Sequence, residues 1–249
     1  MRKKFVIADI RLPDEQKDKL ISLGFTPILL PPSEKLGEAV ASHPDMLMLF
    51  TEDALITERD YYESNRELID SIADLSRREL ILSDAEFKKE YPNDAIFNVG
   101  ICGKQLFMKT DTAAKEIAEY RESRGYTAVS TKQGYPACTV LFLDGNHAIT
   151  SDRGMAKILE KSGVLTTIID NSPSISLPPH EYGFIGGCAG ISRGSVYFTG
   201  NLDAHPDRDK IKQALTDAKL NYTSLSKGEL LFDLGGLRFF DEAIDNNGK

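Results

Sequence analysis

The cysteines and histidines are the residues with which this chain could carry out nucleophilic chemistry. Cys102, Cys138 and Cys188 lie far apart and lack any Cys-x-x-Cys spacing, so the sequence predicts reduced thiols and neither a disulfide framework nor a zinc ribbon. Cys138 and Cys188 stand in apolar runs that we expect to be inner strands, and His180 precedes the second run. A thiolate is a nucleophile when a charged partner lowers its pKa. Free cysteines are also among the most buried residues, so each has the alternative interpretation of a small hydrophobe.

Asn98 and Asp233 are polar residues inside two apolar runs, AIFNV (95–99) and LLFDLGG (230–236), that otherwise predict buried strands. A buried amide or carboxylate needs hydrogen-bond partners, which either a structural network or a shared binding site supplies. In the second interpretation Arg238, which follows the glycine pair, joins them. An arginine in that site would favour an anionic or carboxylate-bearing ligand over a cationic guanidinium.

Asp203, His205 and Asp207 bring metal-ligating side chains together in LDAHPDRD (202–209). The segment directly precedes a helical pattern, and Pro206 is of the type tolerated in a first helical turn. These residues therefore fit a helix-capping segment better than a metal site. The sequence predicts no metal site and no cofactor.

The composition is that of a globular chain with an acidic balance. It has 249 residues, 41% of them hydrophobic, and a net charge of −8. This charge argues against general binding to a nucleic-acid backbone, which needs clustered Lys and Arg. Asp9 interrupts the first apolar run too early for a signal peptide, and no apolar stretch has the length of a membrane span. We therefore expect a cytoplasmic protein without nucleic-acid or membrane partners, and the sequence does not predict its oligomeric state.

A strand followed by a helix recurs along the chain. Five strand-like runs end in a polar residue: FVIAD (5–9), ALITE (54–58), LFMKT (106–110), HAITS (147–151) and VYFTG (196–200). A helical pattern follows each of them, with apolar residues recurring at intervals of three and four. A second β-rich run follows each helix: FTPILL (25–30), RELILS (78–83), TAVSTK (127–132), LTTIID (165–170) and NYTSLS (221–226).

An apolar run also precedes each strand of the first set. These runs are MLMLF (46–50), AIFNV (95–99), TVLFL (139–143), FIGGCAG (184–190) and LLFDLGG (230–236). The last of them can serve only FVIAD, at the other end of the chain. Links such as LDGNH, in which Asp-Gly predicts a hairpin, favour a β-β-α-β unit of about 50 residues over a doubly wound parallel sheet. A helix over 32–43 and the tail DEAIDNNGK are expected to be additions to these units.

Five β-β-α-β units with joined ends resemble the pentein fold. The expected fold class is α/β, a five-fold pseudo-symmetric α/β propeller closed by the N- and C-terminal segments, with residues 1–249 as a single domain. The pentein superfamily contains guanidine-modifying enzymes, namely arginine and agmatine deiminases, amidinotransferases and dimethylarginine hydrolases, and a translation factor that does no chemistry. In the deiminases, a cysteine attacks the guanidinium carbon, a histidine handles protons and carboxylates grip the cation at the mouth of the ring.

The histidine segment of the deiminases is similar to PHEYGF in this chain. The family pattern is like His-x-Asp-Gly-Phe, and His180, Gly183 and Phe184 keep it, whereas Tyr182 stands where the acid is expected. The run ACTVLFLDGNHAITSD (137–152) resembles the unit that carries another carboxylate. The place of that acid falls near Ala137 or Cys138.

The nucleophile segment of the deiminases is similar to GGLRFF in this chain. Gly235, Gly236 and Arg238 match the family pattern, and Phe239 stands where the cysteine is expected. A phenyl ring cannot attack carbon or carry a covalent intermediate. The resemblance therefore implies a pentein scaffold without turnover of arginine or agmatine.

Two functions remain open. The first is a non-catalytic or catalytically divergent pentein that binds a small polar metabolite, or a protein partner, where separate strands converge at the mouth of the ring. Its expected binding residues are Asn98, His180, Gly186, Gly187, Asp233, Gly235, Gly236 and Arg238. Their glycines either let a ligand approach the backbone or relieve crowding of the chain. The alternative is a cysteine-dependent hydrolase or deiminase for a guanidino or related C–N substrate, in which Cys138 or Cys188 works with His180.

Overall fold

Within the residues that the structure describes, the strands form five three-stranded sheets of identical topology. The computed structural model describes residues 2–170, 173–228 and 230–243. In each sheet the middle strand pairs antiparallel with one neighbour and parallel with the other. Four sheets follow chain order: β3 Met48–Phe50, β4 Ala54–Glu58 and β5 Glu79–Ser83; β6 Gly100–Cys102, β7 Gln105–Met108 and β8 Thr127–Ser130; β9 Val140–Phe142, β10 His147–Thr150 and β11 Leu165–Ile168; β13 Ala189–Ser192, β14 Ser195–Phe198 and β15 Asn221–Ser224.

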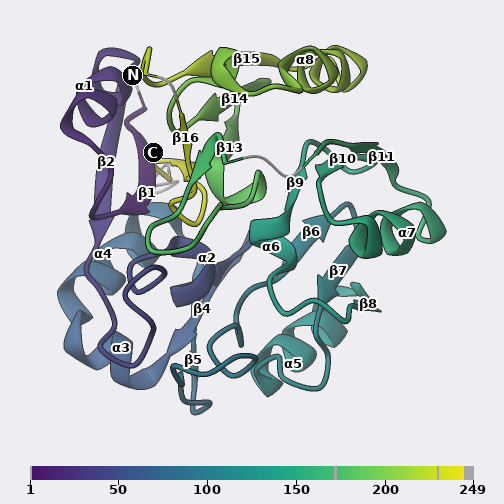
Figure 1. The fold of residues 1–249 in the computed structure, drawn as a ribbon. Coiled ribbons are helices and arrows are strands. Elements are labelled where there is room, and N and C mark those ends of the chain that lie inside the picture. Colours follow the sequence, from purple (N-terminus) through teal and green to yellow (C-terminus); the bar gives the residue numbers. More distant parts are fainter. Residues whose placement is uncertain (1, 171–172, 229, 244–249) are drawn as a thin grey trace, which may run out of the picture.

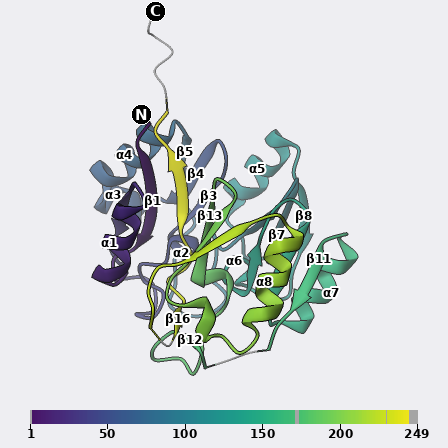
Figure 2. The ribbon, with the colours of Figure 1, turned by 90° about the horizontal axis from the view of Figure 1, so that it is seen from above.

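The fifth three-stranded sheet joins the two ends of the chain. Its order is β17 Arg238–Asp241, β1 Lys4–Asp9 and β2 Phe25–Leu30. Figure 2 shows β17 beside β1, and the antiparallel register places Val6 opposite Phe239. A further pair of short parallel strands, β12 Ile175–Ser176 and β16 Leu231–Phe232, lies outside these sheets.

The longer helices connect the middle strand of a sheet to its third strand. They are α1 Asp14–Ser22, α3 Arg59–Ser64, α4 Arg66–Ser76, α5 Lys115–Arg124, α7 Arg153–Lys161 and α8 Arg208–Asp217. All of them lie at the periphery in Figure 1, whereas the short helices α2 Pro44–Leu47 and α6 Pro136–Thr139 lie near the middle of the molecule. The 3-10 turns are η1 Gly186–Cys188 and η2 Leu202–Ala204.

Helix α7 illustrates how the sequence sets a helix and its buried face. Asp152 caps its start by accepting hydrogen bonds from the backbone N–H groups of Gly154 and Met155. Met155 and Leu159, four residues apart, share the buried stripe. The peripheral helices thus cover one side of the middle strands. Strand β4 is buried at every position, so its other side is covered as well. No helix in the described ranges has the length and apolar character to cross a membrane.

Several predicted elements differ in the structure. The strands expected over 46–50 and 139–143 begin at Met48 and Val140, after the short helices α2 and α6. The strand expected over 95–99 begins only at Gly100, and the strand expected over 184–190 begins at Ala189. No helix forms over 32–43, because hydrogen bonds from Leu36 to Ser33 and from Val40 to Gly37 close separate turns there. The predicted tail lies partly in β17, and residues 244–249 are outside the described residues.

The C-terminal region pairs with the first strand as predicted, but the segment that does so is Arg238–Asp241 and not LLFDLGG. The strand within it, β16, pairs with β12, and β17 is the partner of β1. Gly235 and Gly236 have positive φ values of 68° and 74°, so the extended chain breaks there and starts again at Arg238. Asp233 consequently lies in a loop, as does Asn98 ahead of β6.

Candidate functional site

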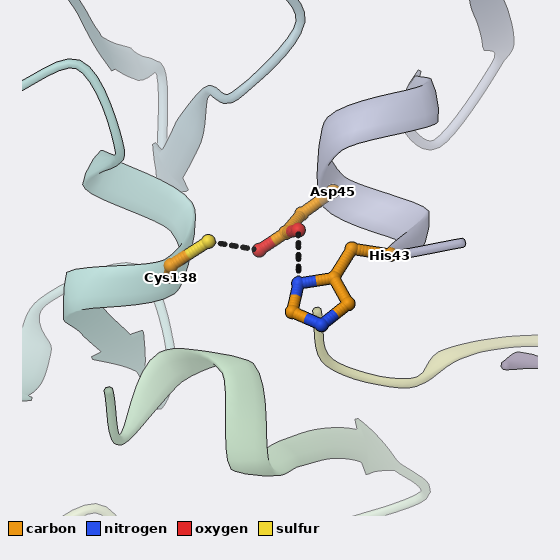
Figure 3. Close-up of side chains that lie close together, drawn as sticks. All are labelled: His43, Asp45 and Cys138. Atoms are coloured by element: carbon orange, nitrogen blue, oxygen red, sulfur yellow. Dashed lines mark hydrogen bonds and ion pairs between the residues drawn. The ribbon is translucent and has the colours of Figure 1, made fainter. Parts of the chain in front are cut away.

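Helices α2 and α6 bring a carboxylate and a thiol together at the centre of the molecule. Each helix begins with a proline, Pro44 and Pro136. The Sγ of Cys138 donates to Oδ2 of Asp45 over 2.8 Å, and Nδ2 of Asn98 donates to the same sulfur over 3.1 Å. Oδ1 of Asn98 accepts from the backbone of α6 at 2.8 Å. Asn98 thus links the thiol to the backbone of α6, and Figure 3 shows the contact between Cys138 and Asp45.

His43 lies fully buried among three carboxylates. Its Nδ1 is 4.0 Å from Oδ1 of Asp45 and 3.9 Å from Oδ1 of Asp233, and its Nε2 is 3.8 Å from Oδ2 of Asp9. Neither ring nitrogen has a hydrogen-bond partner among the described residues. Arg11 forms a bidentate ion pair with Asp9. Its Nε donates to Oδ1 over 2.9 Å, and its Nη2 donates to Oδ2 over 2.6 Å.

Burial determines the protonation of this cluster. Burial lowers the pKa of His43 to about 3 and raises the pKa of Asp45 to about 6. Burial, reinforced by the charge of Asp45, also raises the pKa of Asp233 to about 7. The pKa of the Cys138 thiol is raised well above its ordinary value by burial and then by the charges of Asp45 and Asp233. The surroundings therefore favour a neutral imidazole and a neutral thiol.

A cavity of about 600 Å³ adjoins this cluster. His43, Cys138 and Asp233 border it as buried residues, and His180 borders it as an exposed residue. Three further acids and four aromatic rings complete its wall: Glu38, Asp94, Glu181, Tyr91, Tyr135, Tyr182 and Phe184. Acids thus outnumber the one lysine of this cavity, Lys89.

Asp94 differs from the other acids of the cavity wall in that its two carboxylate oxygens have different surroundings. The hydroxyl of Tyr135 donates to its Oδ2 over 2.5 Å. Its Oδ1 is buried and has no hydrogen-bond partner within the described part of the chain. Burial raises the pKa of Asp94, and the hydrogen bond from Tyr135 acts in the opposite direction. One oxygen of this carboxylate is therefore held by Tyr135, and the other is a buried acceptor at the cavity wall without a partner among the described residues.

Arg238 borders a different cavity from His180 and Asp233. This second cavity, of about 390 Å³, is also bordered by Asp45, Arg78 and Phe239. The ring of Phe239 packs against Tyr197, with centroids 5.1 Å apart. The structure thus brings His180, Asp233 and Cys138 to one cavity and Arg238 to another, on whose border Asp45 also lies. Arg238 therefore does not line the cavity beside Asp233, although its charge lowers the pKa of Asp45 against the larger effect of burial.

The remaining predicted site residues lie in tightly packed backbone. A Cβ on Gly187 would overlap the carboxylate of Asp233, and one on Gly235 would overlap the side chain of His43. Gly186 is confined in the same way by backbone carbonyls of 137, 138 and 140, and a Cβ on Gly236 would lie 2.6 Å from the guanidinium of Arg238. All four glycines therefore relieve crowding of the chain against itself.

Cys188 and His205 do not join the central cluster. Cys188 donates to the carbonyl of Phe184 at 3.1 Å, and burial raises the pKa of its thiol. The Nδ1 of His205 accepts the backbone N–H of Asp207 at 3.0 Å, and Asp203 pairs with Lys212. Among the described residues, one group has ligand atoms close enough to hold a metal ion, and it consists of His43, Asp45 and Cys138.

Sequence reasoning missed His43, Asp45, Asp9 and Asp94. One signal was available, because HPDML and YPACT both place a proline and a polar or thiol side chain directly ahead of a hairpin. Comparing these two segments would have drawn attention to Asp45 alongside Cys138. The sequence holds no comparable signal for Asp94, whose role depends on its contact with Tyr135.

The fold places this protein in a known structural class. The structure is similar to DDAH from Pseudomonas aeruginosa in a complex with citrulline, with a TM-score of 0.55, 12% identity, and coverage of 92% of this chain and 94% of that chain. It is similar to agmatine deiminase from C. jejuni, with a TM-score of 0.54, 9% identity, and coverage of 90% and 88%. It is also similar to an amidinotransferase from Microseira wollei, with a TM-score of 0.53, 12% identity, and coverage of 88% of this chain and 87% of that chain.

These structures share the pentein fold, and the protein described here has it too. The resemblance expected from the sequence is thereby confirmed for the fold. Within this class, residues 7–238 match the family of unknown function DUF6873, and the chain belongs to that family. No sequence among the curated proteins matches the chain.

Proposed function

We propose that this protein is a non-catalytic pentein that binds a small organic cation, such as a guanidinium or ammonium compound, in the cavity above Asp233. We also propose that its five sheets are the blades of one closed five-fold propeller, a single domain over 1–249, with this cavity at the mouth. The identical sheet topology and the pairing of β1 with β17 support the ring. Relatives of the same fold include an agmatine deiminase and an amidinotransferase.

The observation that carries the proposal is the carboxylate of Asp94. Its Oδ1 is buried at the cavity wall without a hydrogen-bond partner among the described residues, while Tyr135 holds its other oxygen. A buried acceptor without a partner is costly, and a guanidinium or ammonium group of a ligand would satisfy it with a charge-assisted hydrogen bond. The aromatic rings beside it provide faces for cation–π contacts.

The environment of Cys138 argues against thiol catalysis. A catalytic cysteine needs a cationic or basic neighbour that lowers its pKa. Cys138 donates instead to the carboxylate of Asp45, and burial and nearby acids raise its pKa. Phe239, at the place of the family nucleophile, packs between Phe25 and Tyr197. These features support binding without turnover.

Thermal shift with a matched panel of compounds tests the proposal. The panel is agmatine, arginine, citrulline and glutamate, each added to the full chain in the presence of a metal chelator. Stabilisation by agmatine and arginine, with no effect of citrulline or glutamate, is the expected result, because a ligand that binds the folded state raises its stability. Stabilisation by the anion alone, or by none of the compounds, would overturn it.

A second candidate function is a cysteine-dependent hydrolase. Its supporting observation is that Cys138 and His180 border the same cavity. It requires release of ammonia or citrulline from arginine or agmatine, above that of a heat-inactivated sample. The non-catalytic function predicts no release.

A further inference from the structure

We propose that His43, Asp45 and Cys138 form a binding site for a divalent metal ion of the zinc type. The site lies where α2 and α6 meet (Figure 3), and His43 and Cys138 also border the cavity that contains Asp94. This inference goes beyond the binding of an organic cation and does not depend on it.

The first support is the geometry of the donor atoms. One ligand atom from each of the three residues lies within 4.8 Å of the others, with 2.8 Å between Sγ of Cys138 and Oδ2 of Asp45. Zinc binds sulfur at about 2.3 Å and nitrogen or oxygen at about 2.0–2.2 Å, so the ligands of a tetrahedral site lie roughly 3–4 Å apart. A movement of about 1 Å by buried side chains completes the set.

The second support is a buried imidazole that has no partner. His43 is fully buried, and its Nδ1 faces Asp45 in Figure 3. Neither of its ring nitrogens, nor Oδ1 of Asp45, has a hydrogen-bond partner among the described residues. Buried polar atoms in native proteins are almost always satisfied. A metal ion at this point would satisfy Nδ1 of His43 and the carboxylate of Asp45 together.

The third support is a carboxylate behind the histidine. Metal-binding histidines usually donate their second ring N–H to a carboxylate, which fixes the tautomer. Nε2 of His43 lies 3.8 Å from Oδ2 of Asp9, and Arg11 holds that carboxylate in a bidentate ion pair. Asp9 is thus placed to orient the ring so that Nδ1 points toward Asp45 and Cys138.

The charge and softness of the donors favour zinc. Asp45 and Asp233 are buried carboxylates, and coordination by Cys138 adds a thiolate, so a divalent cation compensates charge that burial makes costly. Thiolate and imidazole ligands suit Zn²⁺, whereas Mg²⁺ and Ca²⁺ prefer oxygen. When the metal ion binds, the thiol proton of Cys138 passes to solvent as the sulfur–metal bond forms.

The test uses the full chain after removal of metal with a chelator that is then dialysed away. Co²⁺ is added first, because cobalt bound to a thiolate gives a near-ultraviolet charge-transfer band, and Zn²⁺ is then titrated by calorimetry. The expected results are one ion per chain, a cobalt band that Zn²⁺ abolishes, and a rise in melting temperature with Zn²⁺.

Three variants locate the site. Cys138→Ser is expected to lose the cobalt band and to weaken Zn²⁺ binding by more than about 100-fold, and Asp9→Asn to weaken it by about 10- to 100-fold. Cys188→Ser is the matched control, because Cys188 is an equally buried thiol bonded to a carbonyl. It should behave as the wild type.

Two outcomes would overturn the inference. One is that the wild-type protein gives neither a cobalt band nor a saturable heat with Zn²⁺. This outcome does not depend on whether any variant folds. The other is an equal effect of the Cys138 and Cys188 substitutions. Because the probe is the metal ion alone, and the cation panel is run with a chelator, failure of this site and failure of the proposed function are distinguishable.

Discussion

Cys138 donates its thiol hydrogen to Oδ2 of Asp45 at 2.8 Å, although 93 positions separate the two residues in the chain. The bond joins α2 to α6 at the centre of the molecule. A thiol that donates to a carboxylate is stabilised as the neutral form, and this is the opposite of what a nucleophilic cysteine requires. We therefore expect the thiol of Cys138 to be unreactive in the folded protein because of this contact.

The reactivity of Cys138 toward iodoacetamide tests that consequence. In the folded, metal-free protein we expect no alkylation of Cys138 below about pH 8, because its pKa is raised and the thiolate is the reactive form. Peptide mapping by mass spectrometry gives the measurement, and the denatured chain gives the positive control. Selective alkylation of Cys138 in the folded protein at neutral pH would instead support the hydrolase.

Asp94 should dominate the affinity for an organic cation. Asp94→Asn removes the charge while preserving shape, and we expect agmatine to bind about 10- to 100-fold more weakly, as befits a lost hydrogen bond to a charged group. Asp111→Asn is the matched control, since Asp111 is exposed and bonds to Lys109. Titration calorimetry measures both. Equal affinity of the Asp94 variant and the wild type would show that the cation binds elsewhere.

The same residue gives the binding a defined pH dependence. A bound cation favours the ionised carboxylate, and burial raises the pKa of Asp94. Affinity should therefore be constant above this raised pKa and fall as the pH decreases through it, at a pH higher than an ordinary carboxyl group would show. The fall should be absent in Asp94→Asn. An affinity that rises toward acid pH has the wrong sign for this account.

Gly187 should tolerate no side chain. Gly187→Ala would push a Cβ into the carboxylate of Asp233, so we expect a loss of about 1–3 kcal/mol or more in the free energy of unfolding. Gly37→Ala is the control, because nothing lies within 4 Å of its added Cβ, and its effect should stay within about 0.5 kcal/mol. Urea unfolding of both variants measures the difference. Similar stabilities would contradict the described packing of Asp233.

Deletion of residues 237–249 should prevent cooperative folding. It removes β17, the antiparallel partner of β1, and leaves the fully buried Val6 and Ile7 on an open sheet edge. A thermal melt followed by circular dichroism, compared with the full chain, gives the measurement. A truncated chain that melts with unchanged midpoint and cooperativity would contradict both the pairing and the proposed ring.

Much of the fold was predictable because its middle strands and helices carry strong local patterns. The runs ALITE and FTPILL match β4 and β2 residue for residue. The first strand of each sheet was harder, because turns held by tertiary contacts decide where it begins. Asn98 accepts the backbone N–H of Ala137, and the glycine pair before Arg238 turns the chain. No local pattern contains either contact.

The site was only partly predictable for a related reason. Asn98 and Asp233 stood out as polar residues in apolar runs, and the structure places both at the central cluster. His43 did not stand out, since it directly precedes the short helix α2, and two of the three carboxylates around it, Asp9 and Asp233, come from distant segments. The cavity that Arg238 borders depends on where β17 begins. The sequence-based prediction of an anionic ligand depended on the position of Arg238.

One measurement tests the central claim most directly: calorimetric titration of the chelator-treated full chain with agmatine, followed by mass spectrometry of the recovered ligand after prolonged incubation. The account predicts a saturable single-site heat that Asp94→Asn diminishes, and agmatine recovered unchanged without release of ammonia. The absence of binding heat, or conversion of agmatine to a deiminated product, would contradict it.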